Sequence, residues 1–236
     1  MKRYLKEKSY RCAIVAESVY KGRCLAASGL PLANSAARHL FGQDYQKLFA
    51  VCPIGFRGMI YHDTHDDSFI MAFRGSANPF DWITNAKQYF GTKAAHYEKA
   101  KEIIQSYTGN EKLYLAGHSL GGGLATVASI VSGLQAHVFN PPRIHEDTLD
   151  GFDISAFHSR IHRYVMKGEY LDFCSTINKP FRIWTHEIGE KIELHVWCIK
   201  RPFLLLGGRV LPIIPEAIRL HGMKAVLKGL RRHFSW

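Results

Sequence analysis

The chain has 236 residues, 47% of them hydrophobic, so we expect a single domain, 1–236, with a sizeable core. Its five cysteines are odd in number and lack CxxC spacing, which argues against a disulfide framework and against a zinc site. The charged start, Met1–Lys8, is followed by no long apolar run. We therefore expect no signal peptide and no membrane-spanning segment, and a protein that is cytoplasmic when made.

The first half of the chain alternates helical and strand-like segments. Apolar residues at helical spacing predict an amphipathic helix over residues 10–20, and a shorter helical stretch is expected around 33–40. Residues 55–61 and 68–73 predict the two strands of a hairpin around the polar turn His62–Asp67. That turn is acidic, but its spacing matches no EF-hand loop, so we expect a hairpin tip and no metal site.

The second half continues this alternation. The predicted elements are a helix over 94–107, strands over 113–116, 136–139 and 161–165, and a helix over 124–134. Residues 181–185 and 192–199 predict a hairpin around Gly189, and the apolar segment 203–214 suggests a pocket lining or a buried edge. Strands that alternate with helices indicate an α/β fold with a mostly parallel central sheet flanked by helices. Sites in such sheets form at the carboxyl ends of the strands.

One segment carries the strongest chemical signal. The apolar run Leu113–Ala116 leads directly into Gly117-His118-Ser119-Leu120-Gly121-Gly122-Gly123, a Gly-x-Ser-x-Gly string between a predicted strand and a predicted helix. A sharp turn of this kind exposes a serine hydroxyl to a base, and small flanking residues let the backbone turn. Ser119 is therefore the candidate nucleophile of an acyl-transfer reaction.

Acyl transfer also needs N–H donors for the anionic oxygen of the tetrahedral intermediate. The backbone N–H of Leu120, the residue after the nucleophile, supplies one donor. The predicted strand 68–73 ends in Arg74-Gly75-Ser76, a turn after a buried strand. Ser76 fits the position of the second donor.

The residues alone leave the base and its orienting acid open. In this architecture both follow the serine along the chain. The later histidines are His137, His145, His158, His162, His186, His195, His221 and His233. His195 lies within an apolar strand, where we expect a core role. Glu169 follows Gly168 at the end of a predicted strand and Asp172 lies three residues later, so both are candidate acids.

These segments together resemble the class 3 lipase family, the fungal-lipase-like branch of the α/β-hydrolases. Phe73–Ser76 resembles the family's FRGT/S segment, Asp81–Asn85 its D-W-x-x-N stretch, and Gly117–Gly122 its GHSLGG string. Phe139–Ile144 resembles its F-G-x-P-R-V strand exit, with Asn140 where the family usually has glycine. The resemblance covers most of the chain, from the first helix to the C-terminal helix.

The resemblance implies roles for particular residues. It implies Ser119 as nucleophile, His221 as base and Glu169 as acid. The family usually has Asp at the acid position, so Asp172 stays open as the alternative. The implied oxyanion-hole residues are Ser76 and Leu120, and the implied lid and acyl-groove residues are Pro79, Phe80 and Trp82. No cofactor and no metal is implied.

The activity implied by the resemblance is hydrolysis of lipid esters, and a phospholipase A acting on membrane phospholipids is the favoured reading. Small lipases of this kind include bacterial phospholipase effectors that dedicated secretion systems export. Such an effector would have an immunity or accessory protein as a partner. A neutral-lipid lipase or an acyltransferase would use the same triad. A non-catalytic membrane-surface binding protein on a hydrolase scaffold is the alternative from another class.

The C-terminal region is strongly basic and contributes much of the formal net charge of +11. From Lys200 to Trp236 there are eight Lys or Arg residues and one acid, Glu216. Residues 223–234 place apolar side chains on one side of a predicted helix and cations largely on the other. Such a helix packs on the core with a solvated basic face, or lies on an anionic membrane. We expect an anionic membrane surface as partner and no nucleic acid, because no nucleic-acid-binding module is recognisable.

Overall fold

The computed structural model describes residues 2–21, 25–33, 36–42, 56–75, 86–109, 112–149, 151–169, 171, 185–195, 203–206, 209–212 and 214–234. For residues 2, 86–94, 185, 203–206, 209–212 and 214–217 this description covers the backbone.

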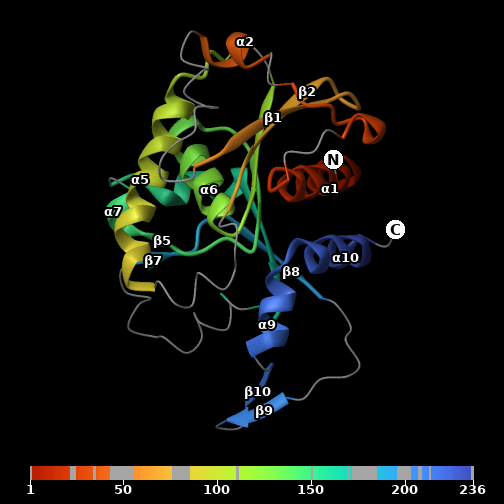
Figure 1. The fold of residues 1–236 in the computed structure, drawn as a ribbon, viewed down its shortest axis with the longest axis vertical. Helices are drawn as coiled ribbons and strands as arrows, with labels where there is room; N and C mark the ends of the chain where they lie inside the picture. Colours follow the sequence, from red (N-terminus) through yellow and green to blue (C-terminus); the bar gives the residue numbers. More distant parts are fainter. Residues whose placement is uncertain are drawn as a thin grey trace.

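A six-stranded sheet organises the fold, with its strands in the order β1-β2-β3-β4-β6-β8 (Figure 1). These strands are β1 (Gly58–Asp63), β2 (Ser68–Phe73), β3 (Leu113–His118), β4 (Ala136–Phe139), β6 (Ile161–Met166) and β8 (Glu190–Leu194). β1 and β2 form an antiparallel hairpin, and the other neighbouring strands of this sheet are parallel. The predicted hairpin and the mostly parallel sheet are both confirmed.

Helices cover both faces of this sheet (Figure 1). On one face lie α5 (Ala86–Gln105) and α6 (Leu120–Ser132), and on the other lie α1 (Lys2–Ser18) and α10 (Met223–His233), which contact each other. Each face has its own cluster of buried hydrophobic residues. The remaining elements are η1 (Ala26–Ser28), α2 (Ala37–Phe41), β5 (Ile144–His145), α7 (Glu146–Leu149), η4 (Ile154–Arg160), β7 (Thr185–His186), β9 (Phe203–Leu206), β10 (Arg209–Pro212) and α9 (Ile214–His221).

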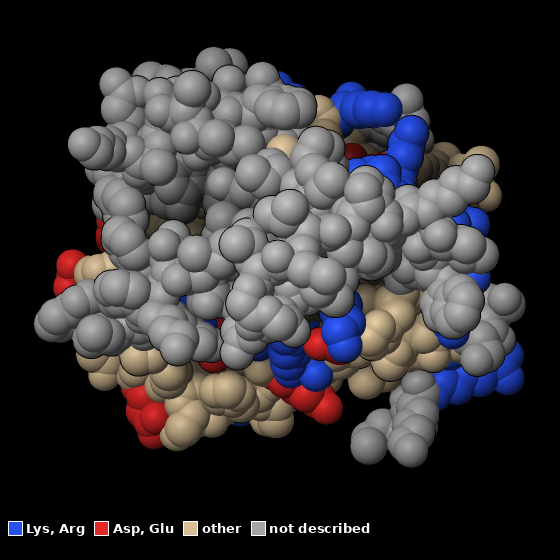
Figure 2. All heavy atoms as spheres, turned by 90° about the horizontal axis from the view of Figure 1, so that it is seen from below, with Lys and Arg blue, Asp and Glu red and all other residues tan. Residues whose placement is uncertain are grey.

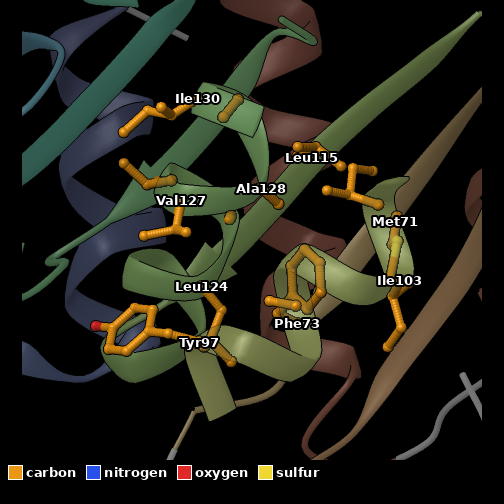
Figure 3. Packing of buried hydrophobic residues seen from close by; sticks show 14 of the residues in the cluster. Met71, Phe73, Tyr97, Ile103, Leu115, Leu124, Val127, Ala128 and Ile130 are labelled. Carbon is orange, nitrogen blue, oxygen red and sulfur yellow. The ribbon is translucent and has the colours of Figure 1, made fainter. Parts of the chain in front are cut away.

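The helix α6 is almost entirely buried, since every residue from Leu120 to Ile130 is buried. Figure 3 shows α6 packed against the sheet and against α5. Its side chains Leu124, Val127, Ala128 and Ile130 belong to the same buried cluster as Met71, Phe73 and Leu115 of the sheet and Tyr97 and Ile103 of α5. A helix that is apolar all round has to be covered on all sides. Because α6 begins directly after Ser119, this burial also fixes the segment that carries the candidate nucleophile.

The first helix begins at Lys2, well before the predicted start at residue 10. The charged residues at its start belong to it because Lys8 points inward and is fully buried. Its Nζ lies 2.5 Å from Oδ2 of Asp63 and 2.8 Å from Oδ1 of Asp66. Arg11 Nε donates to the same Asp63 oxygen at 2.7 Å. The acidic hairpin tip is therefore neutralised by cations from α1.

Two expectations about the second half of the chain are wrong, the hairpin around Gly189 and the core role of His195. Among the described residues 185–195, the predicted hairpin around Gly189 is not formed, because β7 pairs with β5 and β8 pairs in parallel with β6. In segment 203–214, β9 and β10 pair with each other in a sheet of their own, and the expected pocket lining or buried edge stays a prediction. His195 is not a core residue, because its side chain is 57% exposed and lies 3.2 Å from Glu193.

The C-terminal helix α10 packs its apolar side onto the sheet and α1, as predicted by the interpretation that this helix packs on the core. Met223, Val226 and Leu230 are buried, whereas its lysines and arginines are exposed. Within the described part of the chain, no helix combines the length and the hydropathy needed to cross a membrane.

Candidate active site

The predicted sharp turn lies at the carboxyl end of β3, where the chain enters α6. Ser119 occupies this turn with φ 56° and ψ −129°. A serine avoids positive φ in ordinary structure, so the surrounding backbone must hold this conformation in place. The backbone N–H groups of Gly122 and Gly123 both donate to the Ser119 carbonyl, at 2.8 and 3.1 Å. This is the geometry of a nucleophile elbow.

Two glycines make the elbow sterically feasible. A Cβ on Gly117 would lie 2.0 Å from the carbonyl oxygen of Gly121, and a Cβ on Gly121 would lie 2.1 Å from the carbonyl oxygen of Phe73. Both distances are far below van der Waals contact, and the second atom belongs to the end of β2. Gly121 therefore lets the exit of β2 approach the elbow closely.

The exit of β2 carries the segment expected to contribute to the oxyanion hole. Phe73 and Gly117 are paired in the parallel β2–β3 ladder, so both strands end at the same edge of the sheet. A Cβ on Gly75 would lie 2.6 Å from the carbonyl oxygen of His118, which places Gly75 against the elbow. Leu120 opens α6, and the amide of a first helical residue has no carbonyl partner within its own helix. Ser76 itself lies outside the described residues.

The fold brings one late histidine and one carboxylate together. Nδ1 of His221 lies 2.5 Å from Oε2 of Glu169, and the two side chains are 11% and 2% exposed. His221 is the last residue of α9, and Gly222 caps the start of α10, so the imidazole projects from a break between two helices. The base implied by the resemblance therefore lies at the junction of α9 and α10.

Glu169 is held by the turn that follows β6. Gly168 adopts φ 73°, and the Glu169 N–H donates to the Met166 carbonyl at 3.0 Å. Oε2 of Glu169 also accepts a hydrogen bond of 2.9 Å from the backbone N–H of Leu171. A carboxylate with two donors at one oxygen is suited to hold an imidazole in the tautomer that carries its proton on Nδ1, so that Nε2 is the nitrogen that can act as a base. Asp172, the alternative acid, lies outside the described residues.

His221 lies directly beside the elbow. Its ring centroid is 4.9 Å from that of His118, the residue before Ser119. His137 and His162 instead lie next to each other with ring centroids 5.1 Å apart, and His137 also contacts Ser9 of α1. The resemblance singled out His221 from the later histidines, and the fold brings that residue to the elbow.

Two further residues hold the site, and sequence reasoning gave neither a role. His118 Nε2 donates to the backbone carbonyl of His221 at 2.6 Å, and its Nδ1 lies 3.1 Å from the Tyr20 hydroxyl. Burial, together with the nearby His221, lowers the pKa of His118 to about 3, so it is a neutral hydrogen-bonding group. Asn140 also donates to the His221 carbonyl, at 2.9 Å. The signals were present: His118 stands inside the Gly-x-Ser-x-Gly string, and Asn140 replaces the glycine usual at its position.

The residues expected to form a lid, Pro79, Phe80 and Trp82, lie outside the described residues. In the part of the chain that the structure describes, no three His, Cys, Asp or Glu side chains gather in a way that could hold a metal ion.

Comparison with known proteins agrees with this geometry. Residues 11–194 match the family model of the Tle-like phospholipase domain. The chain is 29% identical over 197 residues to the extracellular phospholipase A1 of Serratia liquefaciens, a match that covers 80% of this chain and 60% of that protein. The chain thus spans less than two thirds of this curated relative.

Solved structures of fungal lipases share the fold. The Rhizomucor miehei lipase in its propeptide complex superimposes with a TM-score of 0.55 at 15% identity, covering 82% of this chain and 69% of that chain. The lipase of Rhizopus microsporus var. chinensis gives a TM-score of 0.51 at 16% identity, covering 82% and 75%. The expected fungal-lipase-like α/β-hydrolase fold is confirmed, and the chain belongs to the Tle-like phospholipase domain family.

Proposed function

We propose that this protein is a serine-dependent phospholipase A that cleaves an acyl ester of membrane phospholipids. The observation that supports this most is the buried contact of 2.5 Å between His221 Nδ1 and Glu169 Oε2, next to the strained elbow of Ser119. The Serratia relative is a phospholipase A1, which supports phospholipid as the substrate class. That relative is also extracellular, which supports export of this protein.

The proposed reaction proceeds in two steps. Ser119 Oγ attacks the acyl carbonyl carbon while Nε2 of His221 takes the hydroxyl proton, and the backbone N–H of Leu120 donates to the oxyanion. Collapse of the intermediate breaks the ester C–O bond, and His221 passes its proton to the leaving alkoxide of the lysophospholipid. Water then attacks the acyl-enzyme with His221 again as base, which releases the fatty acid and restores Ser119. Glu169 holds the ring of His221 and stabilises the imidazolium.

Product analysis tests this proposal. Vesicles of mixed phospholipids and, in parallel, a triglyceride emulsion are incubated with the native protein and with Ser119→Ala, and the products are identified by mass spectrometry. The proposal expects equal amounts of fatty acid and lysophospholipid from the native protein, and neither from Ser119→Ala. Fatty acid from triglyceride alone would make the protein a neutral-lipid lipase, and transfer of the acyl group to another lipid without fatty acid release would make it an acyltransferase.

We also propose that the exposed side of α10 binds anionic membrane surfaces. Its cations Lys224, Lys228, Arg231 and Arg232 are exposed, while the opposite side of the helix is buried. Figure 2 views the molecule from below, with left and right as in Figure 1. Most of the Lys and Arg side chains that it shows lie in its right half, the side on which Figure 1 draws α1 and α10. Each cation close to an anionic leaflet adds about 1 kcal/mol of attraction.

A pair of charge-reversal variants tests the membrane surface. Lys228→Glu changes an exposed position of α10. Arg38→Glu makes the same change in net charge at an exposed position of α2, which Figure 1 draws well away from α10. Binding is measured by sedimentation with phosphatidylcholine vesicles that contain or lack phosphatidylglycerol. Lys228→Glu is expected to weaken binding to the anionic vesicles about tenfold or more, since it replaces attraction by repulsion. Equal losses in the two variants would leave α10 without a specific role.

A further inference from the structure

Asn140 occupies a position from which one side chain reaches two functional segments. It follows β4, is fully buried, and has φ 44°. Its Nδ2 donates to the carbonyl oxygen of His221 at 2.9 Å, and its Oδ1 accepts from the backbone N–H of Met166 at 2.8 Å. An amide with its donor and its acceptor both engaged has a fixed orientation.

The His221 carbonyl needs external donors because of where it lies in the chain. His221 is the last residue of α9, and the final carbonyls of a helix have no partner within that helix. Here the carbonyl accepts from Asn140 and, at 2.6 Å, from Nε2 of His118. These two donors fix the backbone of His221, and with it the origin of the imidazole.

The other end of Asn140 fixes the segment of the acid. Met166 is the last residue of β6, and its carbonyl accepts from the N–H of Glu169 at 3.0 Å. Asn140 therefore bridges the backbones of the two segments whose side chains meet at the 2.5 Å contact between His221 and Glu169. A shift of either segment would lengthen that contact.

We propose that Asn140 is a positioning residue that sets the separation between Glu169 and His221, with His118 as the second donor to the His221 carbonyl. The catalytic roles of Glu169 and His221 belong to the proposed function, on which this inference rests. The conformation itself does not require Asn, because glycine adopts positive φ at lower cost. The advantage of Asn at this position lies in its two hydrogen bonds.

Two substitutions separate the side chain from the backbone. Asn140→Gly keeps positive φ accessible and removes both hydrogen bonds. Asn140→Asp keeps an acceptor for the Met166 N–H but places an oxygen against the His221 carbonyl, an unpaired contact between two acceptors. We expect kcat on phospholipid to fall about 10- to 100-fold in Asn140→Gly with KM little changed, and further in Asn140→Asp, because a displacement of about 1 Å is costly to catalysis.

A spectroscopic readout makes the test independent of turnover. The proton shared by His221 Nδ1 and Glu169 Oε2 should give a low-field ¹H NMR signal, identified by its loss in Glu169→Gln. The inference expects this signal to shift or broaden in both Asn140 variants while the melting temperature of Asn140→Gly stays near that of the native protein. If the native protein proves inactive, the proposed function fails, yet this signal still tests the role of Asn140.

His118, the other donor to the His221 carbonyl, provides a second pair of variants. His118→Gln can place an amide N–H near the position of Nε2, whereas His118→Phe cannot, so Gln should retain more of both the signal and kcat. The inference is overturned if the signal and kcat are unchanged in both Asn140 variants. It is equally overturned if activity falls only in step with the melting temperature while the signal stays in place, because that result would indicate a purely structural residue.

Discussion

His221 and Glu169 are 52 positions apart in the sequence, yet Nδ1 of the first lies 2.5 Å from Oε2 of the second. Two different parts of the fold create this contact: the turn after β6 holds the carboxylate, and the break between α9 and α10 holds the imidazole. Both side chains are nearly buried, so water competes little for the hydrogen bond. The contact fixes the ring orientation on which, in the proposed reaction, proton transfer from Ser119 depends.

Replacing the carboxylate by an amide should remove most of the activity. Glu169→Gln keeps the shape of the side chain but cannot stabilise an imidazolium, and its NH₂ group can favour the wrong tautomer. We expect kcat on phospholipid to fall about 10⁴-fold, as in other triads that lose the charge of the acid. Asp172→Asn is the matched control and should retain activity close to the native value. If Asp172→Asn lost its activity while Glu169→Gln retained it, the acid would be Asp172.

A methyl group at the elbow should damage both stability and activity. In Gly121→Ala the new Cβ would lie 2.1 Å from the Phe73 carbonyl oxygen, so the elbow and the exit of β2 would have to separate. We expect a lower melting temperature and loss of esterase activity on a soluble ester. Gly222→Ala is the control, because among the described residues a Cβ there meets only the Arg219 carbonyl, at 3.5 Å. Comparable activity in the two variants would show that the close approach is not needed.

The buried ammonium of Lys8 should be required for stability. Lys8→Met would leave Asp63, which is fully buried, and Asp66 without one of their cationic partners. Removing one partner of a buried ion pair costs about 3–5 kcal/mol. Urea unfolding should show this loss, whereas Arg3→Met, which removes an exposed pair with Glu7, should change little. A stability of Lys8→Met equal to that of the native protein would contradict the role given to this cluster.

Acidification should destabilise the fold. Burial lowers the pKa of His118 to about 3 and lowers the pKa of His137 well below its usual range, the latter also because of His162, Lys8 and Arg11. In the unfolded chain both have a pKa of about 6.5. Below that pH the unfolded state binds protons that the folded state does not bind. Stability is therefore expected to fall as pH falls, by up to about 1.4 kcal/mol per pH unit for each histidine.

Urea titrations between about pH 7.5 and about pH 5 check this slope. His137→Gln is the matched variant, since an amide does not titrate and should flatten the dependence. An unchanged slope in that variant, or a stability that rises on acidification, would be inconsistent with a neutral buried His137.

The sequence predicted those parts of the fold that depend on local signals. The strand, the sharp turn at Ser119 and the helix that follows are encoded within one short segment, and the fold class follows from the alternation of strands and helices. The start of α1 was missed because Lys8 looks like a solvent-exposed residue until Asp63 and Asp66 are seen beside it. The hairpin around Gly189 was predicted wrongly because β8 pairs with β6, which lies far from it in sequence.

The site was predictable in proportion to how local its residues are. Ser119 and the Leu120 amide follow from the turn itself. Glu169 was a candidate because it ends a strand, but His221 stood out only through resemblance to a family. The sequence marks Asn140 and His118 as unusual residues but does not show what they bind. Their shared partner, the backbone carbonyl of His221, is brought to them only by the fold.

Covalent labelling measures the central claim most directly. The native protein, Ser119→Ala and His221→Ala are treated with a fluorophosphonate, and the modified residue is located by peptide mass spectrometry along with the rate of labelling. We expect the adduct on Ser119 in the native protein, no adduct in Ser119→Ala, and labelling slowed by several orders of magnitude in His221→Ala, since the serine is then without its base. An adduct on another residue, or equal rates in the native protein and His221→Ala, would contradict the account.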